Sequence, residues 1–200
     1  VGTDSEKGSC IIMNTGQLFK YFTEEKQAGK TFFNEQGQAM VSFDICAEQT
    51  DCAFVVELKT PQGGTTPLFM NGGGKMLGVE IYPDATSHSD KEVEYEANRW
   101  YNIKMVIHGK QSYIDVYLDN QYWNRIDRPL SGFFNPDIDP EKAKIESIDF
   151  TVRGDWTMDS TGAVVGGGSG RFKIANLTYG LPKPSEMEEV AFVKNEVGNI

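Results

Sequence analysis

Residues 99–123, RWYNIKMVIHGKQSYIDVYLDNQYW, alternate apolar and polar side chains in two runs, and this alternation decides the fold. In the first run, one face of an extended chain carries Tyr101, Ile103, Met105 and Ile107. A polar break at 109–112 contains glycine, and the alternation then resumes through Leu118. Asp119-Asn120 follows, and both residues tolerate the left-handed backbone of a tight turn. The pattern predicts a β-hairpin with a further turn after it.

The composition limits both the class of protein and the class of partner. The chain has 200 residues, 39% of them hydrophobic, which is enough to bury the core of one all-β domain. A net charge of −10 disfavours nucleic acid, whose phosphates require clustered lysine and arginine, and it suits a neutral polymer or a bound cation. No apolar run approaches the about 18 residues of a membrane-spanning helix, so we expect no membrane insertion.

Short strand-like segments and turns follow one another through most of the chain, as is typical of an antiparallel sandwich or barrel. We expect a loose N-terminal segment at 1–10, a β-sandwich domain at 11–180 and a linker or tail at 181–200. The tail begins with two prolines in four residues, so we expect it to lead to a further domain of a larger chain. The first residues show no signal-peptide pattern, and an exported protein would therefore appear here in its mature or trimmed form.

Several segments resemble one fold family. RWYNIKMVI at 99–107 followed by YIDVYLDNQ at 113–121 resembles the paired central strands of concanavalin A-like jelly-roll domains. GQAMVSFDI at 37–45 resembles an early core strand of these domains, and GRFKIANLTYG at 170–180 resembles their last strand, which pairs near the N-terminal one. The turn has Asp119-Asn120 where glycine is usual. The resemblance implies an all-β, two-sheet antiparallel jelly roll over about residues 11–180, as in laminin-G-like and carbohydrate-binding modules and some glycan-degrading enzymes.

The catalytic motifs of that superfamily are incomplete in this sequence. Family 16 glucanases carry alternate carboxylates on one strand, whereas Glu146 and Asp149 are three residues apart and would point to opposite faces. Alginate-lyase jelly rolls carry a Gln-Ile-His strand and a tyrosine-rich strand. The segments 106–108 and 113–117 are similar, but the glutamine and the arginine-rich strand are missing. We interpret His108, next to a glycine, as a solvated turn residue and predict no catalytic residue.

Aromatic side chains carry the better functional signal, because sugar rings pack their C–H faces on tryptophan and tyrosine. Trp100 starts a strand and is expected to pack in the core. Trp156 lies in a glycine-rich segment beside Asp155, where either a ligand-binding role or a cap over the end of the sandwich is plausible. The candidate ligand-binding residues are Trp156, Trp123, Tyr122, Arg125 and Asp155.

An acidic segment suggests a cation. Asp137, Asp139 and Glu141 place carboxylates at alternate positions, and Ca²⁺ takes six to eight oxygen ligands. Many jelly-roll modules hold a structural calcium, so the resemblance favours this possible cofactor. The alternative is a solvated acidic loop in which an aspartate caps a helical turn.

The chain contains three cysteines. Cys46 and Cys52 flank a polar pentapeptide between two strand-like runs, and in a hairpin they would face each other near disulfide spacing. The alternative is two small buried thiols. Cys10 has no evident partner.

Two functions from different classes fit these observations. The first is a non-catalytic carbohydrate-binding or accessory module of a secreted or cell-surface protein that degrades or adheres to glycans, with a polysaccharide or glycan as partner. The second is a polysaccharide lyase or glycoside hydrolase on the same fold. A structural spacer is the third possibility. A sheet face lined with aromatic and amide side chains would favour binding, whereas a pair of carboxylates or a Tyr–His pair would favour chemistry.

Overall fold

A computed structural model gives the fold, and it describes residues 1–23, 37–60, 63–70, 73–77, 80–81, 87–88, 91–109, 113–127, 145–154, 157–158, 164–165 and 169–182. Its strands are β1 Gly2–Asp4, β2 Gly8–Asn14, β3 Leu18–Phe22, β4 Gln38–Ala47, β5 Ala53–Thr60, β6 Gly63–Met70, β7 Lys75–Leu77, β8 Glu80–Ile81, β9 Ser87–His88, β10 Glu92–Glu94, β11 Trp100–His108, β12 Tyr113–Leu118, β13 Gln121–Asp127, β14 Ser147–Arg153, β15 Thr157–Met158, β16 Val164–Val165 and β17 Arg171–Gly180. Among these residues, no helix is long and apolar enough to cross a membrane.

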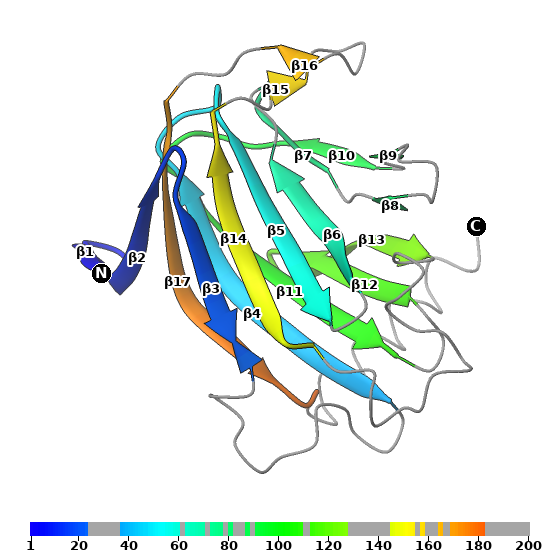
Figure 1. Ribbon diagram of the computed structural model, residues 1–200. Helices are drawn as coiled ribbons and strands as arrows, with labels where there is room; N and C mark the ends of the chain where they lie inside the picture. Colours follow the sequence, from blue (N-terminus) through cyan, green and yellow to red (C-terminus); the bar gives the residue numbers. More distant parts are fainter. Residues whose placement is uncertain are drawn as a thin grey trace.

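Most strands belong to two antiparallel sheets that form the layers of a sandwich (Figure 1). One sheet has seven strands in the order β1-β2-β17-β4-β11-β12-β13, and the other has six in the order β10-β7-β6-β5-β14-β3. Two short pairs, β15-β16 and β8-β9, complete the described strands. The last strand, β17, pairs with β2 near the N-terminus, as the resemblance implied, and its other edge pairs with β4. The all-β, two-sheet antiparallel jelly roll is confirmed.

The hairpin predicted from residues 99–123 lies in the seven-stranded sheet between β4 and β13. β11 pairs with β12 from Ile103 opposite Leu118 to His108 opposite Tyr113. Asp119 and Asn120 have φ values of 50° and 64°, so the predicted left-handed turn joins β12 to β13. β11 also pairs with β4 over all nine of its residues, which places the hairpin beside the early core strand.

The predicted face of β11 points into the core. Tyr101, Ile103, Met105 and Ile107 are all buried in one hydrophobic cluster between the sheets. Aromatic rings join the two layers: Phe43 of β4 meets Phe150 of β14 edge-on at 5.2 Å, and Phe54 of β5 stacks on Phe172 of β17 at 4.8 Å. Because side chains alternate along a strand, the core-facing set leaves a second set on the outer face of the seven-stranded sheet.

The segment 1–10, expected to be loose, contains β1 and the start of β2, with a turn at residues 5–7 between them. β1 and β2 pair from Gly2 opposite Cys10 to Asp4 opposite Gly8 and form a hairpin at the edge of the seven-stranded sheet. Gly8 has a φ of 72°, a conformation that glycine adopts without strain. We call residues 2–14 the N-terminal hairpin. Of the tail expected at 181–200, residues 183–200 lie outside the described part.

Candidate functional site

The outer face of the seven-stranded sheet, the side turned away from the core, collects polar and aromatic side chains. They come from the even-numbered residues of β4 and β11, the odd-numbered residues of β12, and parts of β13, β17 and the N-terminal hairpin. Many are buried, including Gln38, Asp44, Lys104, His108, Asp115 and Tyr117. A face that only met solvent would not bury so many polar groups, so we take this outer face as the candidate site.

A buried ion pair lies at one end of the face. Asp115 of β12 is fully buried and accepts hydrogen bonds from Arg125 of β13, through Nε at 2.8 Å and Nη2 at 3.1 Å. His108 Nε2 lies 3.3 Å from the same carboxylate. Burial opposes ionisation, but the hydrogen bonds from His108 and Arg125 outweigh it and lower the pKa of Asp115. Asp115 is therefore ionised, and its carboxylate holds Arg125 and His108 in place.

A β-bulge brings Arg125 to this face. The β12–β13 register shifts after Val116, so that Tyr122 stands opposite Tyr117 while Asn124 stands opposite Val116. The extra residue, Trp123, is half-buried and packs against the core cluster. Strict alternation from Tyr122 would have sent Arg125 inward, and the bulge returns it to the outer face beside Asp115.

His108 belongs to this buried group, so its interpretation as a solvated turn residue is wrong. Its exposed fraction is 5%. Its ring stacks on Tyr113 with centres 4.2 Å apart, and its Nδ1 lies 3.3 Å from Gln38 Nε2. Gln38 stands directly opposite His108 in the β4–β11 register. Alternation along β11 places His108 on the same outer face as Lys104 and Val106, and both of these side chains are also buried.

Lys104, Tyr117 and Tyr122 form a transverse row across three neighbouring strands. Lys104 stands opposite Tyr117, and Tyr117 stands opposite Tyr122. The Lys104 ammonium lies 5.0 Å from the centre of the Tyr117 ring, and that ring meets Tyr122 edge-on at 5.7 Å. Burial is the main cause that raises the pKa of Tyr117, so its hydroxyl stays protonated. The row combines a cation with two amphipathic rings.

Further along the face, Asp44 of β4 is the centre of an amide network. Asn102 Nδ2 donates to Asp44 Oδ1 at 2.8 Å, and Asn176 Nδ2 donates to Oδ2 at 2.7 Å. Asn176 has a φ of 51° and lies in a bulge of β17. Lys7 of the N-terminal hairpin pairs with the same carboxylate at 3.1 Å. Burial opposes ionisation here too, but these hydrogen bonds lower the pKa of Asp44.

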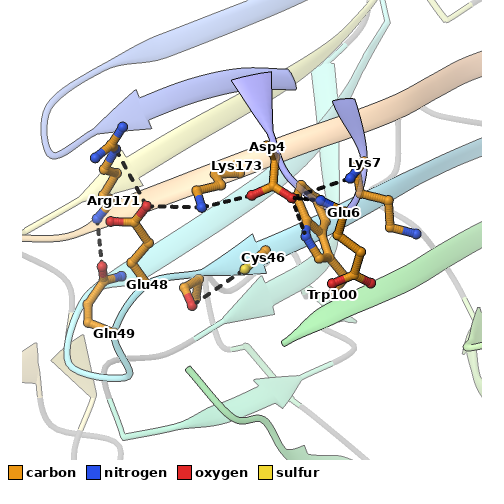
Figure 2. Close-up of polar contacts among 10 residues, drawn as sticks. Asp4, Glu6, Lys7, Cys46, Glu48, Gln49, Trp100, Arg171 and Lys173 are labelled. Atoms are coloured by element: carbon orange, nitrogen blue, oxygen red, sulfur yellow. Dashed lines mark hydrogen bonds and ion pairs between the residues drawn. The ribbon is translucent and has the colours of Figure 1, made fainter. Parts of the chain in front are cut away.

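The turn of the N-terminal hairpin folds against this end of the face (Figure 2). Asp4 accepts hydrogen bonds from Trp100 Nε1 at 3.3 Å and from Lys173 Nζ at 3.0 Å. The Lys7 ammonium lies 5.9 Å from the centre of the Trp100 ring. The backbone N–H of Glu6, followed by Lys173, lowers the pKa of Asp4 to about 2. Trp100 therefore lies on the outer face under the hairpin, and the expectation that it packs in the core is wrong.

The candidate ligand-binding residues predicted from the sequence separate in the structure. Tyr122 and Arg125 lie on the outer face. Trp123 packs against the core cluster, so it does not stand free as a platform. Trp156 and Asp155 lie outside the described residues, and their role stays a prediction.

The calcium ligands predicted from the sequence, Asp137, Asp139 and Glu141, also lie outside the described residues. Within the described part of the chain, no group of three or more histidine, cysteine, aspartate or glutamate side chains could hold a metal ion. The calcium site therefore stays a prediction.

The bridge expected between Cys46 and Cys52 is absent, because all three cysteines are buried free thiols. The segment between them is not a hairpin turn. It leads from β4 in the seven-stranded sheet to β5 in the six-stranded sheet. Cys52 belongs to the core cluster, whereas Cys46 follows core-facing Ile45 and therefore faces outward. Burial raises the pKa of both thiols.

Sequence reasoning missed most of this site, because the site depends on pairing between distant strands. Gln38, Asp44 and Asn176 come from β4 and β17, far in sequence from the β11–β12 hairpin. One signal was available, since the outward positions of 100–118 include Asn102, Lys104, Asp115 and two tyrosines. The β12–β13 bulge gave no signal that periodicity could detect.

A scan against models of protein families finds no match. A search of curated proteins finds none either. Among solved structures, the chain is similar to a sialidase, with a TM-score of 0.51 and 16% identity over 76% of this chain, although it spans only 14% of that protein. It is also similar to alginate lyase AlgAT5 from polysaccharide lyase family 7, with a TM-score of 0.51 and 11% identity over 88% of this chain and 80% of that one. At these identities the likeness shows the fold alone, which is a two-sheet jelly-roll sandwich.

Proposed function

We propose that this protein binds a glycan on the outer face of its seven-stranded sheet and does not cleave it. The observation that carries the proposal is the row of Lys104, Tyr117 and Tyr122, flanked by the Asp115–Arg125 pair. Sugars combine C–H faces, which pack on aromatic rings, with hydroxyls that exchange hydrogen bonds with amides, carboxylates and guanidinium groups. The row places both kinds of partner on one surface.

The state of the carboxylates supports binding rather than hydrolysis. Hydrolysis of a glycosidic bond uses two carboxyl groups about 5–9 Å apart, one of which attacks the sugar or activates water. On the outer face, Asp115 is held by Arg125 and His108, and Asp44 is held by two amides and Lys7. Both carboxylates have lowered pKa values, so neither is suited to donate a proton near neutral pH.

The setting that we propose is extracellular. A glycan-binding sandwich suits an accessory or adhesive part of a larger secreted or cell-surface protein, which would hold the polymer while another domain acts on it. The similar structures include a protein named as a sialidase and one named as an alginate lyase. These names are consistent with a carbohydrate context, but they assign no binding residue in this chain.

A titration against a broad panel of polysaccharides tests the proposal. Tyr122→Ala removes the half-buried ring at the end of the row and should weaken binding by about 1–3 kcal/mol, the range for burying an aromatic side chain. Phe22→Ala is the matched control, because Phe22 is 46% exposed on β3 of the other sheet. Equal loss in both variants would contradict the outer face as the site. Absence of binding to every polysaccharide in the panel would favour a structural spacer.

A second candidate is a polysaccharide lyase, and one observation favours it. His108 and Tyr113 stack at 4.2 Å, with Gln38 at 3.3 Å from the histidine and Arg125 3.9 Å from the tyrosine ring centre. A lyase needs a base, an acid and groups that neutralise a uronate carboxylate, and these residue types could supply them. Incubation with uronate polymers, monitored by the ultraviolet absorbance of the unsaturated product, tests this candidate. Product that disappears in His108→Gln would establish it.

A further inference from the structure

Among the described residues, three carboxylates of the outer face are each paired with a cation. The pairs are Asp4 with Lys173 at 3.0 Å, Asp44 with Lys7 at 3.1 Å and Asp115 with Arg125 at 2.8 Å. In each of these pairs the two charges compensate each other.

Lys104 differs from the cations of these pairs. It is only 8% exposed, and among the described residues its ammonium has no carboxylate partner. Its contact is with the face of the Tyr117 ring, 5.0 Å from the ring centre. A largely buried ammonium without a counter-charge is costly, and a ring face compensates only part of that cost. Among the described residues, the positive charge of Lys104 is therefore not compensated by any ion pair.

The hydroxyl of Tyr117 is a second group without a partner. Tyr117 is 3% exposed, and within the described part of the chain its Oη has no hydrogen-bond partner. Its ring packs with Val106 and the half-buried Tyr122. Buried hydroxyls in folded proteins are nearly always hydrogen-bonded, so this group requires an explanation. It lies on the strand next to Lys104 and directly opposite it in the register.

We infer that Lys104 and Tyr117 bind the anionic substituent of an acidic sugar, a carboxylate or a sulfate, while the Tyr122 ring packs on the sugar. This inference rests on the proposed function, and it names acidic glycans as the ligand class. An anion supplies the charge that the ammonium lacks and an acceptor for the phenol hydroxyl. A neutral sugar hydroxyl would satisfy Tyr117 but would leave the charge of Lys104 uncompensated.

The negative net charge of the chain does not oppose this inference at short range. The charge of −10 is spread over the whole sequence. At physiological ionic strength its field is screened beyond about 8 Å, whereas charges in contact within a partly buried site are screened much less. The uncompensated charge of Lys104 therefore governs recognition of a bound acidic group.

Matched polymers that differ only in charge test the inference. Polygalacturonate is compared with its methyl ester, and a sulfated galactan with the same galactan after desulfation, so the two pairs separate carboxylate from sulfate. Lys104→Met keeps the apolar stem and removes the charge, Lys104→Arg restores a charge, and Tyr117→Phe removes only the hydroxyl. Lys59→Met is the control, because Lys59 lies on β5 of the other sheet and pairs with Glu57 at 2.8 Å. Circular dichroism establishes that each variant is folded.

The native protein should bind at least one acidic polymer about tenfold more tightly than its neutral counterpart. Lys104→Met should abolish that preference while keeping affinity for the neutral form, and Lys104→Arg and Lys59→Met should retain it. Tyr117→Phe should reduce the preference severalfold. Binding of neutral polymers alone, or an undiminished preference in Lys104→Met, would overturn the inference while the proposed function stood. Binding of no polymer in either pair or in the wider panel would overturn both.

Discussion

Arg125 holds Asp115 through two hydrogen bonds, at 2.8 Å and 3.1 Å, and its guanidinium also lies 3.9 Å from the centre of the Tyr113 ring. The pair crosses from β13 to β12 on the outer face and exists because the bulge at Trp123 reverses the direction of Arg125. The bulge, the ion pair and the stacked His108–Tyr113 rings therefore form one structural unit.

Removing Arg125 should destabilise the fold. Arg125→Met leaves the fully buried Asp115 with the His108 imidazole, 3.3 Å away, as its one remaining ion-pair neighbour among the described residues, and an uncompensated buried charge costs about 3 kcal/mol or more. Urea denaturation measures the loss. The double variant Asp115→Asn with Arg125→Met should recover part of the stability, because it removes the stranded charge. A double variant that is less stable than Arg125→Met alone would contradict this account.

The N-terminal hairpin should be released in acid. Asp4 has a pKa of about 2 in the folded protein against an ordinary value of 3.8. Because the folded pKa is the lower one, its contribution is complete above about pH 4 and is lost as the pH falls toward 2. The difference in stability between the native protein and Asp4→Asn should therefore be present at neutral pH and should shrink over this interval. A difference that stays constant down to pH 2 would show that the Asp4 charge does not hold the hairpin.

The three thiols should stay free and slow to react. All three are buried, and burial raises the pKa of Cys46 and Cys52. Alkylation by iodoacetamide under native conditions should label them far more slowly than in urea. Peptide mapping after mild oxidation should find no peptide that joins 46 to 52. Recovery of that bridged peptide in good yield would contradict the placement of the two cysteines on opposite sides of the sheet.

Two tryptophans should respond to substitution in opposite ways. Trp123→Ala should lower the stability by about 3 kcal/mol, because Trp123 packs against the core cluster. Trp156→Ala, by contrast, should abolish detectable glycan binding and leave the melting temperature nearly unchanged, as its position between two aspartates in a glycine-rich segment suggests. Thermal unfolding and polymer titration separate the two effects. Unchanged affinity in Trp156→Ala would remove that residue from the site.

The β11–β12 hairpin could be predicted because the local sequence pattern defines it. Alternation in 99–123 predicted the hairpin, the core-facing set from Tyr101 to Ile107 and the left-handed turn at Asp119-Asn120, and all three are confirmed. A strand packs one face against the other sheet when apolar residues recur at every second position, and this period can be read from the sequence. The same reasoning failed at Cys46 and Cys52, because periodicity does not reveal when a chain leaves one sheet for the other.

The candidate site was harder to predict because non-local pairing creates it. Nothing in the sequence indicates that Gln38 lies beside His108, or that Asp4 reaches Trp100. Tyr122 and Arg125 were singled out for their composition and do lie on the outer face, but Trp123 between them turns inward at the bulge. A bulge shifts the alternation by one residue and exchanges which side chains are presented.

The central claim is that the outer face of the seven-stranded sheet binds a glycan, and chemical-shift mapping tests it most directly. Isotope-labelled protein is titrated with an oligosaccharide taken from a polymer that binds in the panel. The account predicts that the largest shifts cluster at Lys104, Tyr117 and Tyr122 and at their neighbours on β11, β12 and β13, with little change along β5 and β14. Shifts that cluster on the six-stranded sheet and leave β11 and β12 unchanged would contradict it.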